Sequence, residues 1–111
     1  MRIIENDKVT RELSKGISFD KEFFPLLERL VKNDIPFDVR RLYDGFQLFY
    51  PNIENQVCDV IIHSGSYGYQ EGLLEIMGLI ENEGGDSVVG YLHEYEVFNA
   101  IFNHYINNKD S

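Results

Sequence analysis

The chain has 111 residues, of which 43% are hydrophobic, and a formal net charge of −9. This length and composition are typical of one globular domain and exclude a disordered segment. The acidic charge disfavours nucleic acid and anionic membranes as partners, because both repel it. No apolar run approaches the roughly 20 residues of a membrane span. A single cysteine, Cys58, cannot form an internal disulfide, so we expect a cytoplasmic protein.

Residues 1–19 are mixed in charge and have only a weak helical pattern, so we expect an N-terminal arm or a short helix. Residues 20–111 are expected to form a single domain. Its first helix is predicted at about residues 22–33, from apolar side chains at helical spacing: Phe23, Leu26, Leu27, Leu30 and Val31. Asp20 is a candidate cap for this helix. Pro25 predicts either an irregular first turn or a helix that begins just before it.

Two strands are predicted over residues 37–43 and 46–50, joined by a two-residue turn at Asp44-Gly45. Asp-Gly between apolar runs is a strong hairpin signal, because the turn needs two positive φ angles. This turn would place six side chains on one face, in the pairs Tyr43 with Phe46, Arg41 with Leu48, and Val39 with Tyr50. The other face would mix polar and apolar side chains: Arg40, Leu42, Gln47 and Phe49.

The rest of the chain is predicted to form three strands, at about residues 57–63, 73–80 and 87–92, and a helix at about 94–106. A short helix is the alternative for 73–80, but its glycine boundaries favour a strand. The final helix has an unbroken apolar stripe: Val97, Phe98, Ile101, Phe102, Tyr105 and Ile106. The element order predicts an α+β fold, in which an antiparallel sheet of three to five strands packs against two main helices.

No catalytic or metal-binding motif is present. Cys58 and His63 have opposite parity on the predicted strand, which favours a buried thiol over a nucleophile paired with a base. The histidines, His63, His93 and His104, lack the spacing of zinc ligands. We therefore expect no catalytic residue, no metal and no cofactor, and a protein that is not an enzyme. A small enzyme remains an alternative only if two carboxyl groups converge in a pocket with perturbed pKa values.

The segment Gly65-Ser66-Tyr67-Gly68 has the spacing of a GxxG nucleic-acid clamp, and the element order is similar to that of double-stranded-RNA-binding domains. Both need basic side chains near the phosphates, and none occurs between Leu42 and Asn108. We therefore favour a glycine-permitted turn and no direct contact with nucleic acid. The loop composition is typical of adaptable binding loops, so Tyr67 and Tyr69 are candidate contact aromatics. Packing over the sheet edge is the alternative for both.

The 67 residues from Leu42 to Asn108 contain ten carboxylates and no lysine or arginine. One interpretation is a solvated surface that keeps a small protein soluble. The other is that rigidly placed carboxylates imitate a row of phosphates and occupy the basic groove of a nucleic-acid enzyme, as a DNA mimic would. Both interpretations remain open at this point.

Residues His63 to Gly78, with the sequence His-Ser-Gly-Ser-Tyr-Gly-Tyr-Gln-Glu-Gly-Leu-Leu-Glu-Ile-Met-Gly, resemble a segment of small uncharacterised proteins from phages and prophages of Gram-positive bacteria. Val89-Gly90-Tyr91-Leu92, with the Glu94, Glu96, Val97 and Phe98 that follow, resembles the Gly-Tyr-Leu-Thr-x-Glu-x-Val-Phe start of their last helix. His93 replaces the capping threonine of that pattern, so a weaker first turn is expected. The resemblance covers about residues 57–106 and implies a small cytosolic accessory protein, with no known activity.

The leading hypothesis is a non-enzymatic acidic binding protein of phage type, which contacts a basic surface of a host protein. Its expected protein-binding residues are Tyr67, Tyr69, Glu71, Glu75, Glu81, Glu83, Asp86, Glu94 and Glu96. No direct nucleic-acid or membrane partner is expected. The alternative is a self-associating structural module, because Leu42 and Phe49 on the second hairpin face would need a cover. A homo-oligomer is therefore left open.

Overall fold

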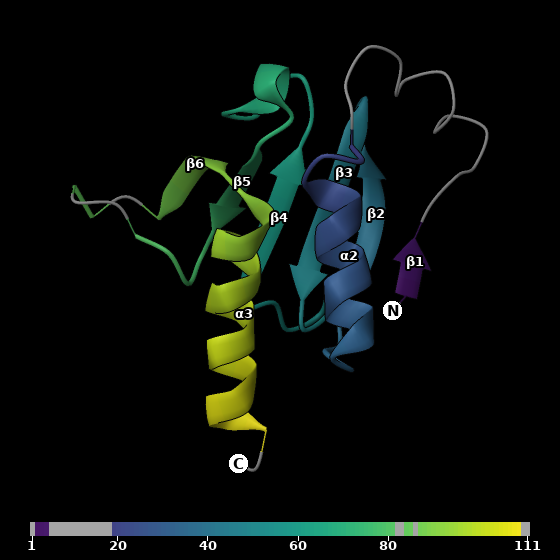
Figure 1. Cartoon of the computed structure of the whole chain (residues 1–111), viewed down its shortest axis with the longest axis vertical. Helices are drawn as coiled ribbons and strands as arrows, with labels where there is room; N and C mark the ends of the chain where they lie inside the picture. The colour runs from purple at the N-terminus through teal and green to yellow at the C-terminus, as the bar shows by residue number, and fades with distance from the viewer. Residues whose placement is uncertain (1, 5–18, 82–83, 86, 110–111) are drawn as a thin grey trace.

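The computed structural model describes residues 2–4, 19–81, 84–85 and 87–109. In this part of the chain a six-stranded sheet packs against two helices (Figure 1). The strands are β1 (Arg2–Ile4), β2 (Asp38–Leu42), β3 (Gly45–Tyr50), β4 (Cys58–Ile62), β5 (Leu74–Met77) and β6 (Val88–Leu92). The helices are α2 (Phe23–Lys32), α3 (Glu94–Asn108) and the short 3-10 helix η1 (Tyr69–Glu71).

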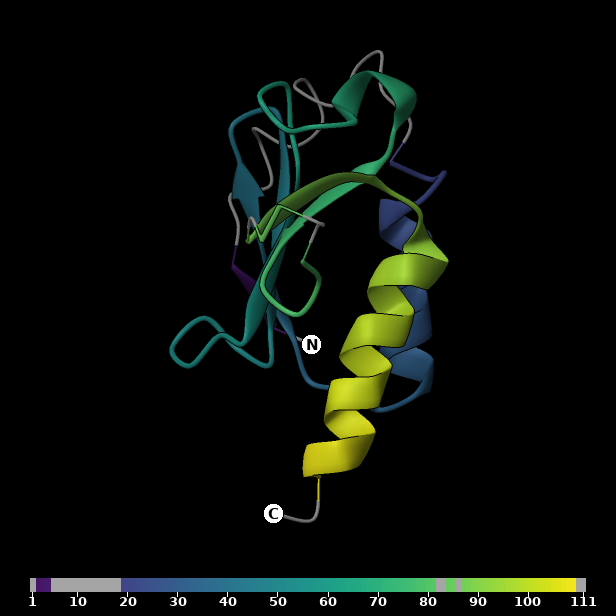
Figure 2. The same ribbon diagram turned by 90° about the vertical axis from the view of Figure 1, so that its left-hand side faces the viewer.

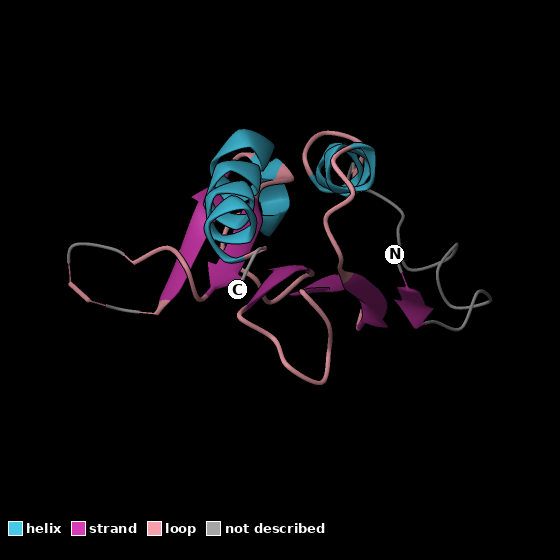
Figure 3. Cartoon of the chain, turned by 90° about the horizontal axis from the view of Figure 1, so that it is seen from below, coloured by secondary structure: helices cyan, strands magenta, loops and turns pink. Residues whose placement is uncertain are grey.

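The strands follow one another across the sheet in chain order, and β2 to β6 are antiparallel neighbours. Both helices cover the same face of the sheet, as Figures 2 and 3 show. The predicted α+β fold, with an antiparallel sheet and two main helices, is confirmed. The prediction of a strand rather than a helix at residues 73–80 is also confirmed, because β5 lies within this range.

The core lies between the helices and the covered sheet face. Phe23, Leu26 and Leu30 of α2 are fully buried there, against strand residues that alternate in and out as a pleated strand requires. On β4 these inward residues are Cys58, Val60 and Ile62, as the sequence predicts. The ends of the helical stripes differ from the prediction, because Val31 and Ile106 are about half exposed.

Pro25 is the third residue of α2, where the missing backbone N–H costs no helical hydrogen bond. The helix therefore begins at Phe23 despite the proline, and Leu26 donates to the Glu22 carbonyl. Glu22, not Asp20, occupies the N-cap position, and its carboxylate makes no capping bond to α2. The expectation that Asp20 caps this helix is therefore wrong.

The β2–β3 hairpin is present, but its turn lies one residue earlier than predicted. Leu42 pairs with Gly45 and Arg41 with Phe46, so the turn residues are Tyr43 and Asp44. Gly45 is needed for another reason: a Cβ there would lie 1.7 Å from the Ile62 carbonyl oxygen. Each β2 residue therefore pairs with a β3 residue two positions earlier than predicted; Val39, for example, pairs with Leu48 and not with Tyr50. Side chains alternate with a period of two along a strand, so the predicted division of side chains between the two sheet faces still holds.

The sheet face opposite the helices has a polar ladder over an aromatic ring. The Nε of Arg40 donates to Gln47 Oε1 at 2.9 Å, and Gln47 Nε2 donates to Asp59 Oδ2 at 3.0 Å. The Arg40 guanidinium lies 5.1 Å from the centre of the Phe49 ring. Phe49 is only 4% exposed. Phe49 therefore needs no cover from a second chain. Such a need motivated the self-association hypothesis.

The N-terminal segment differs from the expected arm or helix where it is described. Residues 2–4 form the edge strand β1, which pairs in parallel with β2. Phe19 is buried, and the centre of its ring lies 5.0 Å from the centre of the Phe46 ring in an edge-to-face arrangement. Residues 5–18, which make up most of the expected arm, lie outside the described residues.

Candidate functional site

One end of the molecule contains the β2–β3 turn, the β4–β5 loop, the end of β6 and the start of α3 (Figure 1). Each of these segments contributes one exposed tyrosine: Tyr43, Tyr67, Tyr91 and Tyr95, which are 75%, 62%, 59% and 56% exposed. We call these four side chains the tyrosine end. They are all the tyrosines that are more than half exposed in the described part of the chain.

The β4–β5 loop is held in place by hydrogen bonds at both of its ends. Ser66 N–H donates to the His63 carbonyl at 2.8 Å, and its hydroxyl also bonds to the His63 backbone. Leu73 N–H donates to the Gly68 carbonyl at 2.9 Å. Gly68 and Gly72, on either side of η1, have φ angles of 97° and 73°, which favour glycine. The loop is therefore built as the glycine-permitted turn that the sequence suggests.

A β-bulge places the Tyr91 ring next to this loop. Glu75 on β5 faces two residues of β6, Gly90 and Tyr91, and Tyr91 has a left-handed φ of 58°. Its N–H donates to the Tyr67 carbonyl, while Tyr67 N–H donates to Glu75 Oε1 at 2.9 Å. A Cβ on Gly90 would lie 2.2 Å from the Tyr67 Cβ. The two exposed tyrosines are therefore positioned by rigid backbone contacts.

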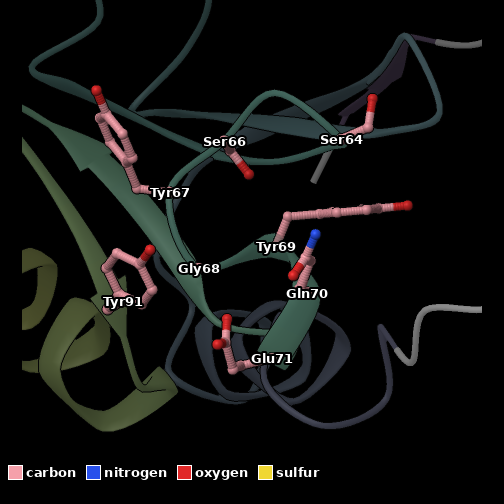
Figure 4. Close-up of a pocket in the computed structure, with 8 residues that line it drawn as sticks. All are labelled: Ser64, Ser66, Tyr67, Gly68, Tyr69, Gln70, Glu71 and Tyr91. Carbon is pink, nitrogen blue, oxygen red and sulfur yellow. The ribbon is translucent and has the colours of Figure 1, made fainter.

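These residues surround a polar cavity of about 260 Å³, drawn in Figure 4. Tyr67 and Tyr91 lie on one side of Gly68 in that view, and Tyr69 and Gln70 on the other. The cavity is lined by Ser64, Ser66, Tyr67, Gly68, Tyr69, Gln70, Glu71 and Tyr91. It is smaller than the roughly 300–1,000 Å³ of most small-molecule sites.

Negative charge predominates around the cavity. Glu71 lines it, Glu75 bonds to Tyr67, and Asp44 accepts from Ser64 N–H at 2.8 Å. Burial raises the pKa of the Tyr69 hydroxyl, and the charge of Asp44 raises it further. The nearest described lysine is Lys21, whose ammonium group donates to the Glu71 carbonyl at 2.8 Å. This lysine comes from the helix side of the fold and was not foreseen from the sequence.

The structure brings only part of the predicted binding set together. Tyr67 and Glu71 lie at the cavity surface, Tyr69 is half-buried and packs against the core, and Glu75 supports the loop. Glu81 is exposed after β5, outside the cavity lining. Glu83 and Asp86 lie outside the described residues. The set also lacks Tyr43, Tyr91 and Tyr95, which its sequence pattern did not single out.

The remaining two, Glu94 and Glu96, are engaged where α2 meets α3. Glu96 Oε1 accepts from the N–H of His93, the N-cap residue of α3. Glu22 from α2 binds His93 Nδ1 at 2.9 Å and accepts from Glu94 N–H at 2.6 Å. The Glu94 carboxylate in turn lies 3.4 Å from Arg29. Carboxylates of both helices thus supply the capping that His93 was expected to provide poorly.

Other candidate chemistry is not assembled in the described residues. Burial raises the pKa of the Cys58 thiol to about 12, and the charge of Asp59 adds to the shift, so a reactive thiolate does not form near neutral pH. The described part of the chain has no group of three or more His, Cys, Asp or Glu side chains that could hold a metal. Among the described lining residues of the cavity, Glu71 is the single carboxylate.

No protein-family model, no curated protein and no solved structure matches the chain. Neither helix in the described ranges combines the length and apolar character needed to cross a membrane.

Proposed function

We propose that this chain is a non-enzymatic binding protein, and that its tyrosine end contacts a basic surface of a partner protein. The observation that supports the proposal most is that the four segments at this end of the sheet (Figure 1) each carry an exposed tyrosine: Tyr43, Tyr67, Tyr91 and Tyr95. Tyrosine supplies a large, rigid contact area together with a polar hydroxyl, and it is enriched among the residues that dominate binding energy.

The partner is proposed to be basic because of the charge around these tyrosines. Asp44, Glu71 and Glu75 lie at this end, and their charge is offset in part by Lys21 and by Arg41, whose guanidinium donates to the Gly45 carbonyl. A surface of this sign attracts lysine and arginine side chains and repels phosphates. The resemblance of residues 57–106 to phage and prophage proteins suggests a host protein as the partner, including one whose basic groove holds nucleic acid.

Three of the predicted binding carboxylates are engaged in bonds within the fold, so they do not form a continuous row of phosphate-like charges. Glu94 and Glu96 have bonds at the helix junction, and Glu75 supports the Tyr67 backbone. We therefore propose that tyrosine contacts provide most of the binding energy, and that charge provides attraction and orientation.

The test is capture of proteins from a Gram-positive bacterial lysate with the tagged full chain and two double variants. The first, Tyr67→Ala with Tyr91→Ala, removes exposed rings at the tyrosine end. The control, Met77→Ala with Ile106→Ala, removes exposed apolar side chains elsewhere. The proposal expects one basic protein to be retained by the wild type and the control and lost by the tyrosine variant. Equal retention by all three chains, with circular dichroism showing each folded, would rule out the tyrosine end as the contact surface.

A further inference from the structure

We propose that the cavity at the tyrosine end accepts one arginine side chain of the partner protein. This inference rests on the proposed function and specifies the group that is recognised. At about 260 Å³, the cavity suits a single side chain better than a metabolite or cofactor.

The walls of the cavity offer acceptors and aromatic faces. Of the groups that line it, the Glu71 carboxylate and the Tyr67 and Tyr91 hydroxyls make no hydrogen bond or ion pair with described residues. The bond from Lys21 goes to the Glu71 backbone carbonyl, so the Glu71 carboxylate has no hydrogen-bond or ion-pair partner among the described residues. A cation over a tyrosine ring is attracted by the negative face of the ring, and the attraction grows as the cation is removed from water.

Guanidinium fits these walls better than ammonium. It is planar, stacks on aromatic rings and presents five donors in a fixed arrangement. The lining offers the Glu71 carboxylate and the Tyr91 hydroxyl as acceptors, whereas the Ser64 and Tyr67 hydroxyls point away from Glu71 in Figure 4. A carboxylate that binds a guanidinium through charge-assisted hydrogen bonds adds directional strength that a point charge lacks.

The strained backbone of Tyr91 indicates that the fold holds this side chain in place at the cavity. A non-glycine residue in the left-handed region stores strain, which persists where the surrounding structure enforces it and is often found at binding sites. Here the bulge and the bond to the Tyr67 carbonyl enforce it. The result is an exposed ring at the cavity, rather than a strand residue facing the core.

The test uses three blocked tripeptides, Gly-Arg-Gly, Gly-Lys-Gly and Gly-citrulline-Gly, titrated into the ¹⁵N-labelled full chain. Citrulline keeps the shape of arginine and removes its charge. We expect the arginine peptide to shift the amide signals of Gly68, Glu71 and Tyr91. We expect about tenfold weaker binding of citrulline and a severalfold weaker binding of lysine.

Two charge-matched variants complete the experiment. Glu71→Gln is expected to weaken the arginine peptide about tenfold. Glu28→Gln removes the same charge from an exposed position on α2, outside the lining, and is expected to have no effect on binding of the arginine peptide. Equal binding of all three peptides, or equal loss in both variants, would overturn the inference. If that happens while Tyr67→Ala with Tyr91→Ala still loses the partner, the proposed function survives and only the arginine assignment fails.

Discussion

Tyrosine has opposite roles at the two ends of the sheet. Tyr50, at the end of β3, is 3% exposed, and its hydroxyl bonds to His104 Nδ1 at 2.8 Å. Burial raises the pKa of this hydroxyl, and the neighbouring Cys58 and Tyr105 raise it further. At the other end, Tyr67 and Tyr91 are more than half exposed. One end of the sheet therefore uses its tyrosine for stability, whereas the other end holds tyrosines available for contact.

Truncation of the buried tyrosine is expected to have the largest effect on stability. Tyr50→Ala is expected to lower the free energy of unfolding by about 3–5 kcal/mol, because it leaves a cavity in the core. Tyr50→Phe, which keeps the ring and removes the bond to His104, is expected to cost about 1 kcal/mol. Urea unfolding measures both. Partner binding by Tyr50→Phe should equal that of the wild type; a loss of binding would contradict the division between the ends.

Gly90→Ala tests the geometry of the tyrosine end without removing a tyrosine. The added methyl group would meet the Tyr67 side chain, so the loop or β6 must move. We expect a loss of about 1–3 kcal/mol in stability and a clear loss of partner binding. Gly85→Ala is a suitable comparison for crowding, because a Cβ there meets nothing within 4 Å, although its φ of 80° adds strain. Binding that survives Gly90→Ala would show that the precise placement of Tyr67 is unimportant.

Glu22→Gln is expected to lower the stability of the fold and to leave partner binding nearly unchanged. It weakens the bonds to His93 and to Glu94 N–H that join α2 to the start of α3. We expect a loss of about 1–2 kcal/mol, measured by thermal or urea unfolding, with little change in partner affinity. Glu28→Gln is the control, because Glu28 is exposed and forms only a surface pair with Lys32. Equal stability of the two variants would contradict the described helix junction.

The smallest and most specific effect is expected at Tyr91. Glycine adopts its left-handed φ without strain, so Tyr91→Gly should raise stability by about 0.5–1 kcal/mol. The same change removes an exposed ring, so partner binding should fall. Urea unfolding of the variant and of the wild type measures the change in stability, and a binding titration with the same preparations measures the change in partner affinity. A variant that loses stability would mean that the tyrosine is held there by favourable packing, rather than by constraint of the backbone.

The fold was largely predictable because hydrophobic periodicity fixes which faces are buried. The alternation on β4 gave the correct inward residues, and the α3 stripe did so for Val97, Phe98 and Ile101, whereas Ile106 at its end is about half exposed. The hairpin turn was misplaced because Gly45 suggested a turn position, whereas it allows close approach to Ile62. That contact joins residues that are distant in sequence, so no local pattern reports it.

The candidate site was only partly predictable. Tyr67 stood in an evident loop, but Tyr43 and Tyr91 lay in apolar runs that read as strands. Their positive φ angles, 54° and 58°, follow from the hairpin turn and the bulge. The roles of Glu94 and Glu96 depend on Glu22 and Arg29 from α2 or on the exact helix start. Charge counting could not distinguish these engaged carboxylates from exposed ones.

Chemical nitration of tyrosines, in the free chain and in its purified complex with the captured basic partner, tests directly whether the tyrosine end is the contact surface. Mass spectrometry then reports the modified positions. In the free chain, Tyr43, Tyr67, Tyr91 and Tyr95 should react and Tyr50 should not, following their exposure. In the complex, Tyr67 and Tyr91 should be protected. If both remain as reactive in the complex as in the free chain, the partner binds elsewhere and the tyrosine end is not the contact surface.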